Sequence, residues 1–398
     1  MRVLICGVDG YLGWSFSLYL AHRGVIVGGV DNFLRRKLVK NIGSNTMFPI
    51  PTMKRRLEIF QDHFNDQLHF YNGDLRQYDF VAKALSDFSP DAIIHLGEIP
   101  SAPYSMIDVN SAVFTQSNNL IGTMNLLFAI KEICPQAHLI KLGTMGEYGT
   151  PNLDIPEGFF DVEFRGRKDR LPFPRKAGSW YHWSKVHDSN NVMYACDLWG
   201  LCATDIMQGV VYGTQISEMN EDRNLSTRFD VDQCFGTVIN RFCAQAAIGH
   251  PLTPFGTGSQ KRGFLPLRDS MQCLNIAINN PPKAGEYRVF NQFEELYSIT
   301  ELASHVSMVG HEIGLTVDIR NIENPRKEAD SHYYNPDHRY LLDLGYIPNH
   351  NLDAEIKIML LDLIRNKSRI EKYKDVLIPD IRWQGPRRRS RYIDHSSG

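Results

Sequence analysis

The stretch VLICGVDGYLG, residues 3–13, decides the fold of this chain. An apolar run leads directly into the glycine pattern G-x-x-G-x-x-G at Gly7, Gly10 and Gly13. Gly7 is expected to form a tight turn, because a Cβ would clash there. Gly10 would let a helix N-terminus approach a pyrophosphate, and Gly13 would let that helix pack closely on the strand. The stretch therefore predicts a strand, a phosphate-binding turn and a helix.

Further short apolar runs continue this pattern along the first half of the chain. They are residues 25–30, 68–71, 92–96, 139–142 and 203–207, with helical patterns between them, for example at 81–88 and 123–133. Near-continuous hydrophobicity predicts strands of a parallel sheet that is covered on both faces. With right-handed crossovers, the alternation predicts an α/β fold with a doubly wound parallel (Rossmann) sheet.

The alternation loosens beyond residue 207, which indicates a second, smaller lobe. We expect residues 1–207 to form the Rossmann domain that binds a dinucleotide. Residues 208–380 would mainly form a C-terminal substrate-binding lobe, and some of the later segments are expected to return to the first domain. Residues 381–398 would form a solvated basic tail. The polar segment 214–232 is expected to be either a lid over a ligand or a plain surface loop.

Composition excludes several classes of function. The 43 basic and 45 acidic residues give a net charge of -2, which argues against nucleic acid as the main partner. No window approaches 18 uninterrupted apolar residues, so we expect no membrane association through a span. The seven scattered cysteines include no C-x-x-C pair, which predicts reduced thiols and no metal site. Without a leader ahead of the first strand, a cytoplasmic location is expected.

An acidic residue at the end of the second strand indicates which dinucleotide binds. Asp31 follows Gly13 by 18 residues, and a carboxylate there can accept hydrogen bonds from a ribose diol while repelling a 2′-phosphate. NAD is therefore favoured over NADP, although Arg35 and Arg36 qualify the choice, since arginines can bind a 2′-phosphate. At the end of the third strand, Asp74 would lie near the adenine or cap a helix.

The motif Y-x-x-x-K at Tyr181 and Lys185 carries the predicted chemistry. On a helix, positions i and i+4 share a face, so we expect the ammonium to lower the pKa of the phenol. The phenolate would then take a proton from a sugar hydroxyl while a hydride leaves for NAD. Thr144, at the end of the fifth strand, would share the substrate's hydrogen bond or act only as a cap. Asn119 would face the cofactor or cap a helix.

The cofactor contacts predicted on these grounds are Gly7, Gly10, Tyr11, Leu12, Gly13, Asp31, Asn32, Arg35, Asp74, Leu75, Asn119, Tyr181, Lys185 and Val211.

Longer strings resemble a known family. The glycine pattern, Thr144 and Y-x-x-x-K are similar to those of the extended short-chain dehydrogenase/reductases that act on nucleotide sugars. The strings SAPYSMID (101–108), KLGTMGEYGTPN (141–152), SKVHDS (184–189), QGVVYG (208–213) and NPR (324–326) resemble the UDP-sulfoquinovose synthases among them. The likeness covers most of residues 1–350.

That resemblance implies a reaction and its partners. Members of the family convert UDP-glucose and sulfite into UDP-sulfoquinovose, with NAD bound throughout. Tyr181 would deprotonate the 4-hydroxyl as NAD takes the C4 hydride, and the resulting ketone would acidify the C5 proton. Loss of that proton and of the 6-hydroxyl gives a 5,6-ene, sulfite adds at C6, and the hydride returns to C4. A homodimer or higher homo-oligomer is also implied.

Proton transfer at C5 and C6 needs an acid–base side chain, and the related 4,6-dehydratases carry theirs at positions where this chain has none. They carry Asp-Glu directly after the strand-end threonine, where this chain has Met145 and Gly146. Glu147 and His182 are therefore candidates for this transfer, with a structural role as the alternative for each. The resemblance also predicts substrate contacts, which are Thr144, Gln208, Arg262 and Arg326, the two arginines for the diphosphate.

Two alternatives and one departure stay open at this point. The same residues would serve a UDP-sugar 4-epimerase or a 4,6-dehydratase-like enzyme, and an NAD-dependent sensor would bind without turnover. The family pattern places an arginine before Ser101, whereas this chain reads Glu98-Ile99-Pro100. Capture of sulfite is therefore expected to differ, and the sulfur donor need not be free sulfite.

Overall fold

A seven-stranded parallel sheet forms the centre of the computed structural model, which describes residues 1–64, 68–219, 222–328 and 332–393. Its strand order is β11-β8-β5-β4-β1-β2-β3. The strands are β1 (Arg2–Cys6), β2 (Ile26–Asp31), β3 (His69–Asn72), β4 (Ala92–His95), β5 (His138–Thr144), β8 (Ala203–Gln208) and β11 (Tyr287–Gln292). The first six confirm the sequence prediction to within two residues.

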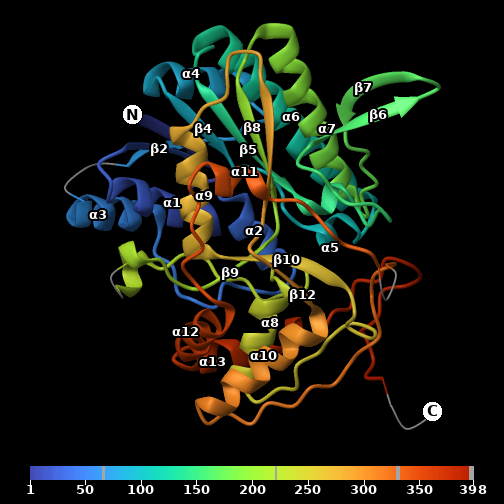
Figure 1. Ribbon diagram of the computed structural model, residues 1–398. Helices are drawn as coiled ribbons and strands as arrows, with labels where there is room; N and C mark the ends of the chain where they lie inside the picture. The colour runs from blue at the N-terminus through green and yellow to red at the C-terminus, as the bar shows by residue number, and fades with distance from the viewer. Residues whose placement is uncertain (65–67, 220–221, 329–331, 394–398) are drawn as a thin grey trace.

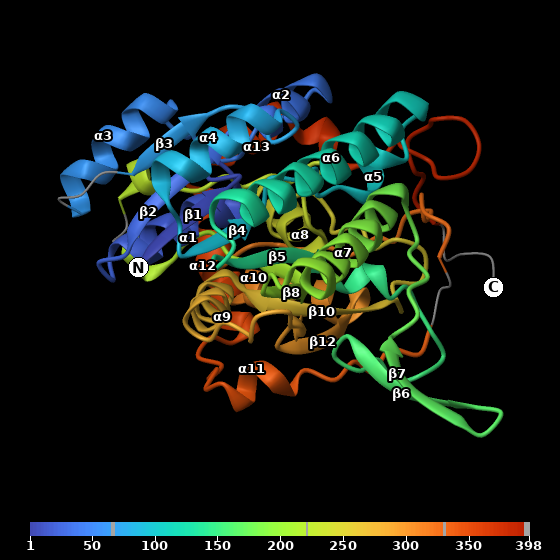
Figure 2. The same ribbon diagram turned by 90° about the horizontal axis from the view of Figure 1, so that it is seen from above.

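Helices cover both faces of this sheet (Figures 1 and 2). One face carries α1 (Tyr11–Ala21) and α9 (Leu267–Asn279), and the other carries α4 (Tyr78–Phe88), α6 (Val109–Ile133) and α7 (Trp180–Trp199). Side chains alternate along β1, so Val3 and Ile5 enter one core while Leu4 and Cys6 enter the other. This arrangement confirms the doubly wound fold.

A second lobe lies beneath the carboxyl edge of the sheet (Figure 1). Its three-stranded sheet has the order β12-β10-β9. The lobe contains β9 (Val210–Tyr212), β10 (Lys261–Pro266), β12 (Glu295–Ser298), α8 (Val238–Ala247), α10 (Ile299–Glu312), α12 (Leu352–Ile364) and α13 (Lys367–Lys372) around a core of its own. Both α9 and β11 follow residue 207 in sequence but pack with the large sheet. We therefore propose that the chain passes between the two lobes more than once after residue 207.

Short elements connect these layers. They are α2 (Leu34–Asn41), α3 (Met53–Phe64), α5 (Ala102–Ser105), α11 (Arg339–Asp343) and the 3-10 turns at 145–147, 217–219, 223–225 and 374–377. The antiparallel hairpin of β6 (Phe159–Phe164) and β7 (Arg167–Pro172) projects from the body beside α7 (Figure 2).

The packing bears on two sequence predictions, one about the segment 214–232 and one about the basic tail. The described part of segment 214–232 is not a plain surface loop, because Leu225 is buried and its carbonyl accepts a hydrogen bond from the Trp14 indole at 2.8 Å. Residues 384–389 of the basic tail are exposed to solvent. Its Arg387 and Arg388 pair with Asp380 and Glu323, which ties the segment to the body, while residues 394–398 lie outside the described part.

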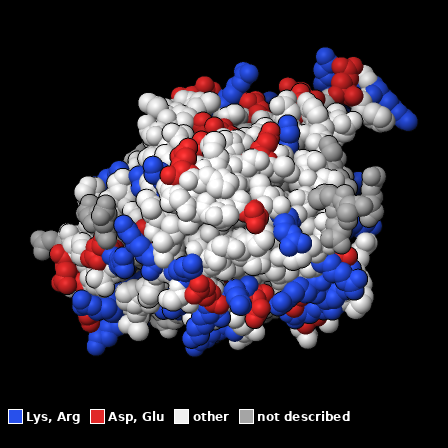
Figure 3. All heavy atoms as spheres, turned by 90° about the horizontal axis from the view of Figure 1, so that it is seen from below, with Lys and Arg blue, Asp and Glu red and all other residues white. Residues whose placement is uncertain are grey.

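Surface and thiol chemistry complete the description. On the face in Figure 3, basic and acidic side chains are interspersed around the margin, and the central area carries few charges. Among the described helices, none combines the length and the apolar character needed to cross a bilayer. All seven cysteines lie in the described residues as free thiols.

Candidate active site

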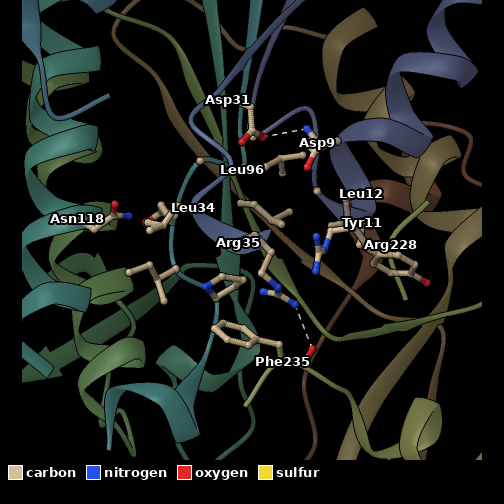
Figure 4. Close-up of a pocket in the computed structure, with 18 of the residues that line it drawn as sticks. Asp9, Tyr11, Leu12, Asp31, Leu34, Arg35, Leu96, Asn118, Arg228 and Phe235 are labelled. Atoms are coloured by element: carbon tan, nitrogen blue, oxygen red, sulfur yellow. Dashed lines mark hydrogen bonds between the residues drawn. The ribbon is translucent and has the colours of Figure 1, made fainter. Parts of the chain in front are cut away.

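A pocket of about 360 Å³ lies at the carboxyl edge of the large sheet, where the loops after β1 and β4 diverge (Figure 4). In a doubly wound sheet this switch point is where ligands bind. Fifteen residues predicted to bind cofactor or substrate line it, namely Gly7, Gly10, Tyr11, Leu12, Gly13, Asp31, Asn32, Arg35, Asp74, Leu75, Thr144, Tyr181, Lys185, Gln208 and Val211. The fold thus brings together segments spread over two hundred residues.

The glycine turn forms a cradle that side chains would fill. Gly7 has φ 89°, and a Cβ on it would lie 2.8 Å from the carbonyl oxygen of Leu96. A Cβ on Gly13 would lie 2.2 Å from the carbonyl oxygen of Gly7. Helix α1 begins after Gly10, which has no side chain to cap it, so its first N–H groups face the pocket. This cradle fits a pyrophosphate.

The acidic end of β2 fits an unphosphorylated ribose. The Asp31 carboxylate accepts the backbone N–H groups of Asp9 (2.9 Å) and Phe33 (2.7 Å). Burial, together with the Asp9 charge, raises the pKa of Asp31 to about 6. The Arg36 guanidinium is held by two 2.6 Å bonds to Asp9, so it is not available to a 2′-phosphate. The residues present therefore fit NAD.

Two neighbouring side chains complete the adenosine end. Arg35 lies over the Phe235 ring at 4.0 Å (Figure 4). Its guanidinium also forms an ion pair with Asp230 at 2.9 Å. Burial opposes ionisation of Asp74, but hydrogen bonds from Arg76 outweigh it and lower the pKa of this carboxyl. Asp74 does not cap α4, whose N-cap is residue 77, so that alternative is wrong.

The predicted catalytic residues meet at the other end of the pocket. Tyr181 and Lys185 lie on the first turns of α7, on one face as the spacing requires. Thr144 ends β5, and its hydroxyl accepts the backbone N–H of Gly146 at 3.2 Å. Its hydroxyl hydrogen is therefore free for another acceptor, so the capping and ligand-binding roles are compatible.

The electrostatics of this end differ from the sequence prediction. The pKa of Tyr181 is raised, not lowered, first by burial and then by the negative charges of Glu98 and Glu147. Lys185 does not offset this, because its ammonium donates to the Glu98 carboxylate and to the Leu142 carbonyl. The carboxylate at residue 98 neutralises the cation that was expected to stabilise a phenolate.

Glu147 does not reach the pocket, which corrects its assignment as a proton-transfer group. It is fully buried, and its carboxylate is held by Arg175 (2.7 Å), by Ser189 (3.0 Å) and by Lys141 (3.5 Å). The same carboxylate accepts the backbone N–H of Thr144 at 3.2 Å. These contacts make Glu147 a support for the strand end that carries the threonine.

His182, Arg262 and Arg326 are not among the residues that line the pocket, although the charges of the two arginines act on His182. Burial lowers the pKa of His182 to about 3, and the charges of Arg326 and Arg262 add to this effect. Arg262 pairs with Glu328 at 2.5 Å, whereas Arg326 lies against the rings of Phe255 and Trp383. The imidazole is therefore neutral near pH 7, at the start of a basic region.

Sequence reasoning missed a third arginine in this region. Arg241, on α8, is 5% exposed, its guanidinium lies over the Phe255 ring at 4.4 Å, and its Nε has no hydrogen-bond partner. Burial and the charge of Arg326 lower its pKa to about 9. A buried cation without a carboxylate beside it fits an anionic ligand. No sequence motif marks Arg241, since it lies in an ordinary amphipathic helix.

The asparagine pair is also corrected. Both residues lie inside α6, so neither caps a helix. Asn119 does not line the pocket: its amide accepts the backbone N–H of Ile99 at 2.8 Å and donates to the Ser184 hydroxyl at 2.9 Å. Its neighbour Asn118 lines the pocket instead (Figure 4). Glu98, three residues beyond β4, also lines the pocket, and the strand-end rule that identified Thr144 would have found it.

Comparison with known proteins identifies the family of the chain. The model of the NAD dependent epimerase/dehydratase family matches residues 3–291. The chain is 47% identical to a UDP-sulfoquinovose synthase of Sulfolobus acidocaldarius, over 97% of this chain and 98% of that protein. It is 46% identical to the chloroplastic UDP-sulfoquinovose synthase of Spinacia oleracea, over 96% of this chain and 79% of that protein.

Solved structures show the same fold. The UDP-glucose-4-epimerase of Stenotrophomonas maltophila, with bound NAD, superposes with a TM-score of 0.70 at 16% identity, covering 94% of this chain and 99% of that one. The chain belongs to the NAD dependent epimerase/dehydratase family, and NAD is its cofactor. Within that family it groups with the UDP-sulfoquinovose synthases.

Proposed function

We propose that this chain converts UDP-glucose and sulfite into UDP-sulfoquinovose. The observation that carries the proposal is the 47% identity, along almost the whole of both chains, to a UDP-sulfoquinovose synthase. The pocket supports it, because Thr144, Tyr181 and Lys185 line one wall. The pocket also continues to Gln208, at the start of the second lobe.

The residues of the pocket can carry the first proton transfer. Tyr181, as the phenolate, would take the proton of the 4-hydroxyl, and the free hydrogen of the Thr144 hydroxyl would hold the same oxygen in place. When bound, NAD supplies the hydride acceptor and donor at C4. Gln208 is tied to Gln292 at 2.8 Å and to Ser270 at 3.3 Å, so it would act as a fixed wall of the hexose site.

We propose His182 as the group that moves protons at C5 and C6. A 4-ketone acidifies the C5 proton, and loss of that proton with the 6-hydroxyl leaves a 5,6-ene to which sulfite can add at C6. A neutral imidazole can accept the C5 proton, and the imidazolium so formed can donate it to the leaving 6-hydroxyl, which departs as water. Met145 and Gly146 offer no such group, and Glu147 is buried in its own network. This arrangement distinguishes the site from a 4,6-dehydratase.

The basic region would bind the anions. Arg241 and Arg326, which both lie over the Phe255 ring, and Arg262, which pairs with Glu328, would supply guanidinium groups for the UDP diphosphate. Pro100 lines the pocket where the family pattern has an arginine. Sulfite would therefore be held with one cation fewer than in that pattern, and saturation would need more sulfite.

A product assay tests the proposal. The purified protein is incubated with UDP-glucose, with and without sulfite, and products are identified by mass spectrometry. A sulfonated UDP-sugar that requires sulfite is expected. UDP-galactose formed without sulfite would establish the 4-epimerase alternative instead, and bound NAD without any turnover would establish a sensor.

Assembly and location are proposed on separate grounds. The outer faces of α6 and α7 expose Val113, Ile121 and Phe128, together with Tyr194 and Leu198. We propose that a second copy covers this apolar face, and Ile121→Glu should yield monomers by light scattering if it does. The seven free thiols support our proposal of a reducing cytoplasmic compartment.

A further inference from the structure

A buried pair of carboxyl groups lies directly behind the catalytic lysine. Glu98 lines the pocket with 8% of its surface exposed, and its Oε2 accepts a hydrogen bond from Lys185. Its Oε1 is buried without a hydrogen-bond donor. Asp188 lies on α7, three residues after Lys185, and is fully buried, with both oxygens equally lacking a donor.

One shared proton would give a partner to two of these three oxygens, one on each carboxyl group. Burial and the Glu98 charge raise the pKa of Asp188 well above its usual range. Burial also opposes ionisation of Glu98, but the Lys185 ammonium outweighs it and lowers that pKa to about 2. Asp188 is therefore protonated and donates its hydrogen to Glu98. Together the two groups carry one negative charge.

The other charges around Lys185 come from every element packed on it. Lys141 on β5 adds a positive charge, His95 on β4 is neutral because burial lowers its pKa to about 4, and Arg35 and Glu147 act on Tyr181 from farther away. Glu98 is the one carboxylate that contacts the ammonium in the described residues. Removing its charge would leave the Lys185 ammonium without a paired carboxylate, one turn from the phenol.

We propose that Glu98, with protonated Asp188 behind it, is a positioning residue that holds Lys185 and sets the pH at which Tyr181 can lose its proton. The proposal rests on the proposed function only for its kinetic readout. By neutralising Lys185, the pair keeps the phenol protonated at neutral pH, which suits the step that returns a hydrogen to the sugar oxygen at C4. It also means that ionisation of Tyr181 needs a higher pH than Lys185 alone would set.

The kinetic test compares Glu98→Gln with Asp188→Asn. The measured quantity is the pH dependence of the rate constant for reduction of bound NAD after UDP-glucose is mixed in. In Glu98→Gln the pH midpoint of this step should fall by roughly 1–3 units, the range that one nearby charge produces. In Asp188→Asn it should stay at the native value, because an amide donates the same hydrogen bond to Glu98. An unchanged midpoint in Glu98→Gln, or an equal fall in Asp188→Asn, would overturn the proposal.

A second measurement needs neither substrate nor a folded Glu98 variant. Infrared difference spectra of native protein minus Asp188→Asn, at pH 8, should show the carbonyl stretch of a protonated carboxyl. Absence of that band would overturn the shared proton and with it the role of Glu98. If native protein fails to reduce its NAD with UDP-glucose, the proposed function fails, while the infrared band still decides the carboxyl pair.

Discussion

Glu147 allows a sharp separation of a structural role from a catalytic one. The Arg175–Glu147 pair is 2.7 Å long, with side chains 6% and 0% exposed, and Lys141 lies 3.5 Å from the same carboxylate. Removing one partner of a buried pair leaves the other uncompensated, which costs about 3–5 kcal/mol. Glu147→Gln and Arg175→Met should each lower the free energy of unfolding by about this amount.

The double variant supplies the decisive measurement. Since each single substitution strands a charge that the other removes, Glu147→Gln/Arg175→Met should lose clearly less stability than the sum of the two losses. Urea unfolding measures all three variants, and deuterium wash-in at C5 of UDP-glucose measures proton exchange in the folded protein. Normal stability of Glu147→Gln combined with loss of C5 exchange would refute the structural reading and restore Glu147 as the base.

Three further predictions concern the cradle, the diphosphate and pH. Gly7→Ala should release NAD on dialysis, because its Cβ meets a carbonyl, whereas Gly24→Ala, at a similar φ of 71° with nothing within 4 Å, should retain it; equal retention would contradict the cradle. Arg241→Met should weaken UDP binding by roughly 10- to 100-fold in calorimetry without changing NAD content, since a charged hydrogen bond contributes about 1.5–3 kcal/mol; unchanged UDP affinity would remove it from the site. Burial lowers the pKa of His138 to about 3. As the pH drops below about 6.5, the unfolded chain therefore becomes protonated at this histidine while the folded chain does not, and the free energy of unfolding falls. Between pH 7 and 5, urea unfolding should show a loss of stability about 2 kcal/mol smaller for His138→Gln than for the native protein.

Much of the fold follows from local chemistry. Strands buried on both faces read as apolar runs, and the glycine turn carries its own steric requirement, so six strands and the first βα unit were predictable from residues 3–207 alone. The seventh strand, β11, was not predictable from the sequence, because apolar and polar residues are mixed in its sequence YRVFNQ. It also follows segments of the second lobe along the chain before it joins the edge of the large sheet.

Some residues of the candidate site were likewise predictable from the sequence, and others were not. Spacing placed Tyr181 and Lys185 on one helical face, and strand ends identified Asp31, Asp74 and Thr144, because parallel strands present their carboxyl ends at one edge. Spacing did not reveal that Glu147 turns inward.

The amino-acid sequence by itself therefore determined the class of fold, the cofactor and the placement of Tyr181 and Lys185 on one helical face, since these depend on glycine sterics and on periodicity within single elements. Only the tertiary structure decided that this lysine pairs with Glu98 and that Glu147 lies outside the pocket. Both depend on which side chains from β4, β5 and α7 meet out of water, and electrostatic interactions in a buried site follow distance and desolvation rather than position along the chain.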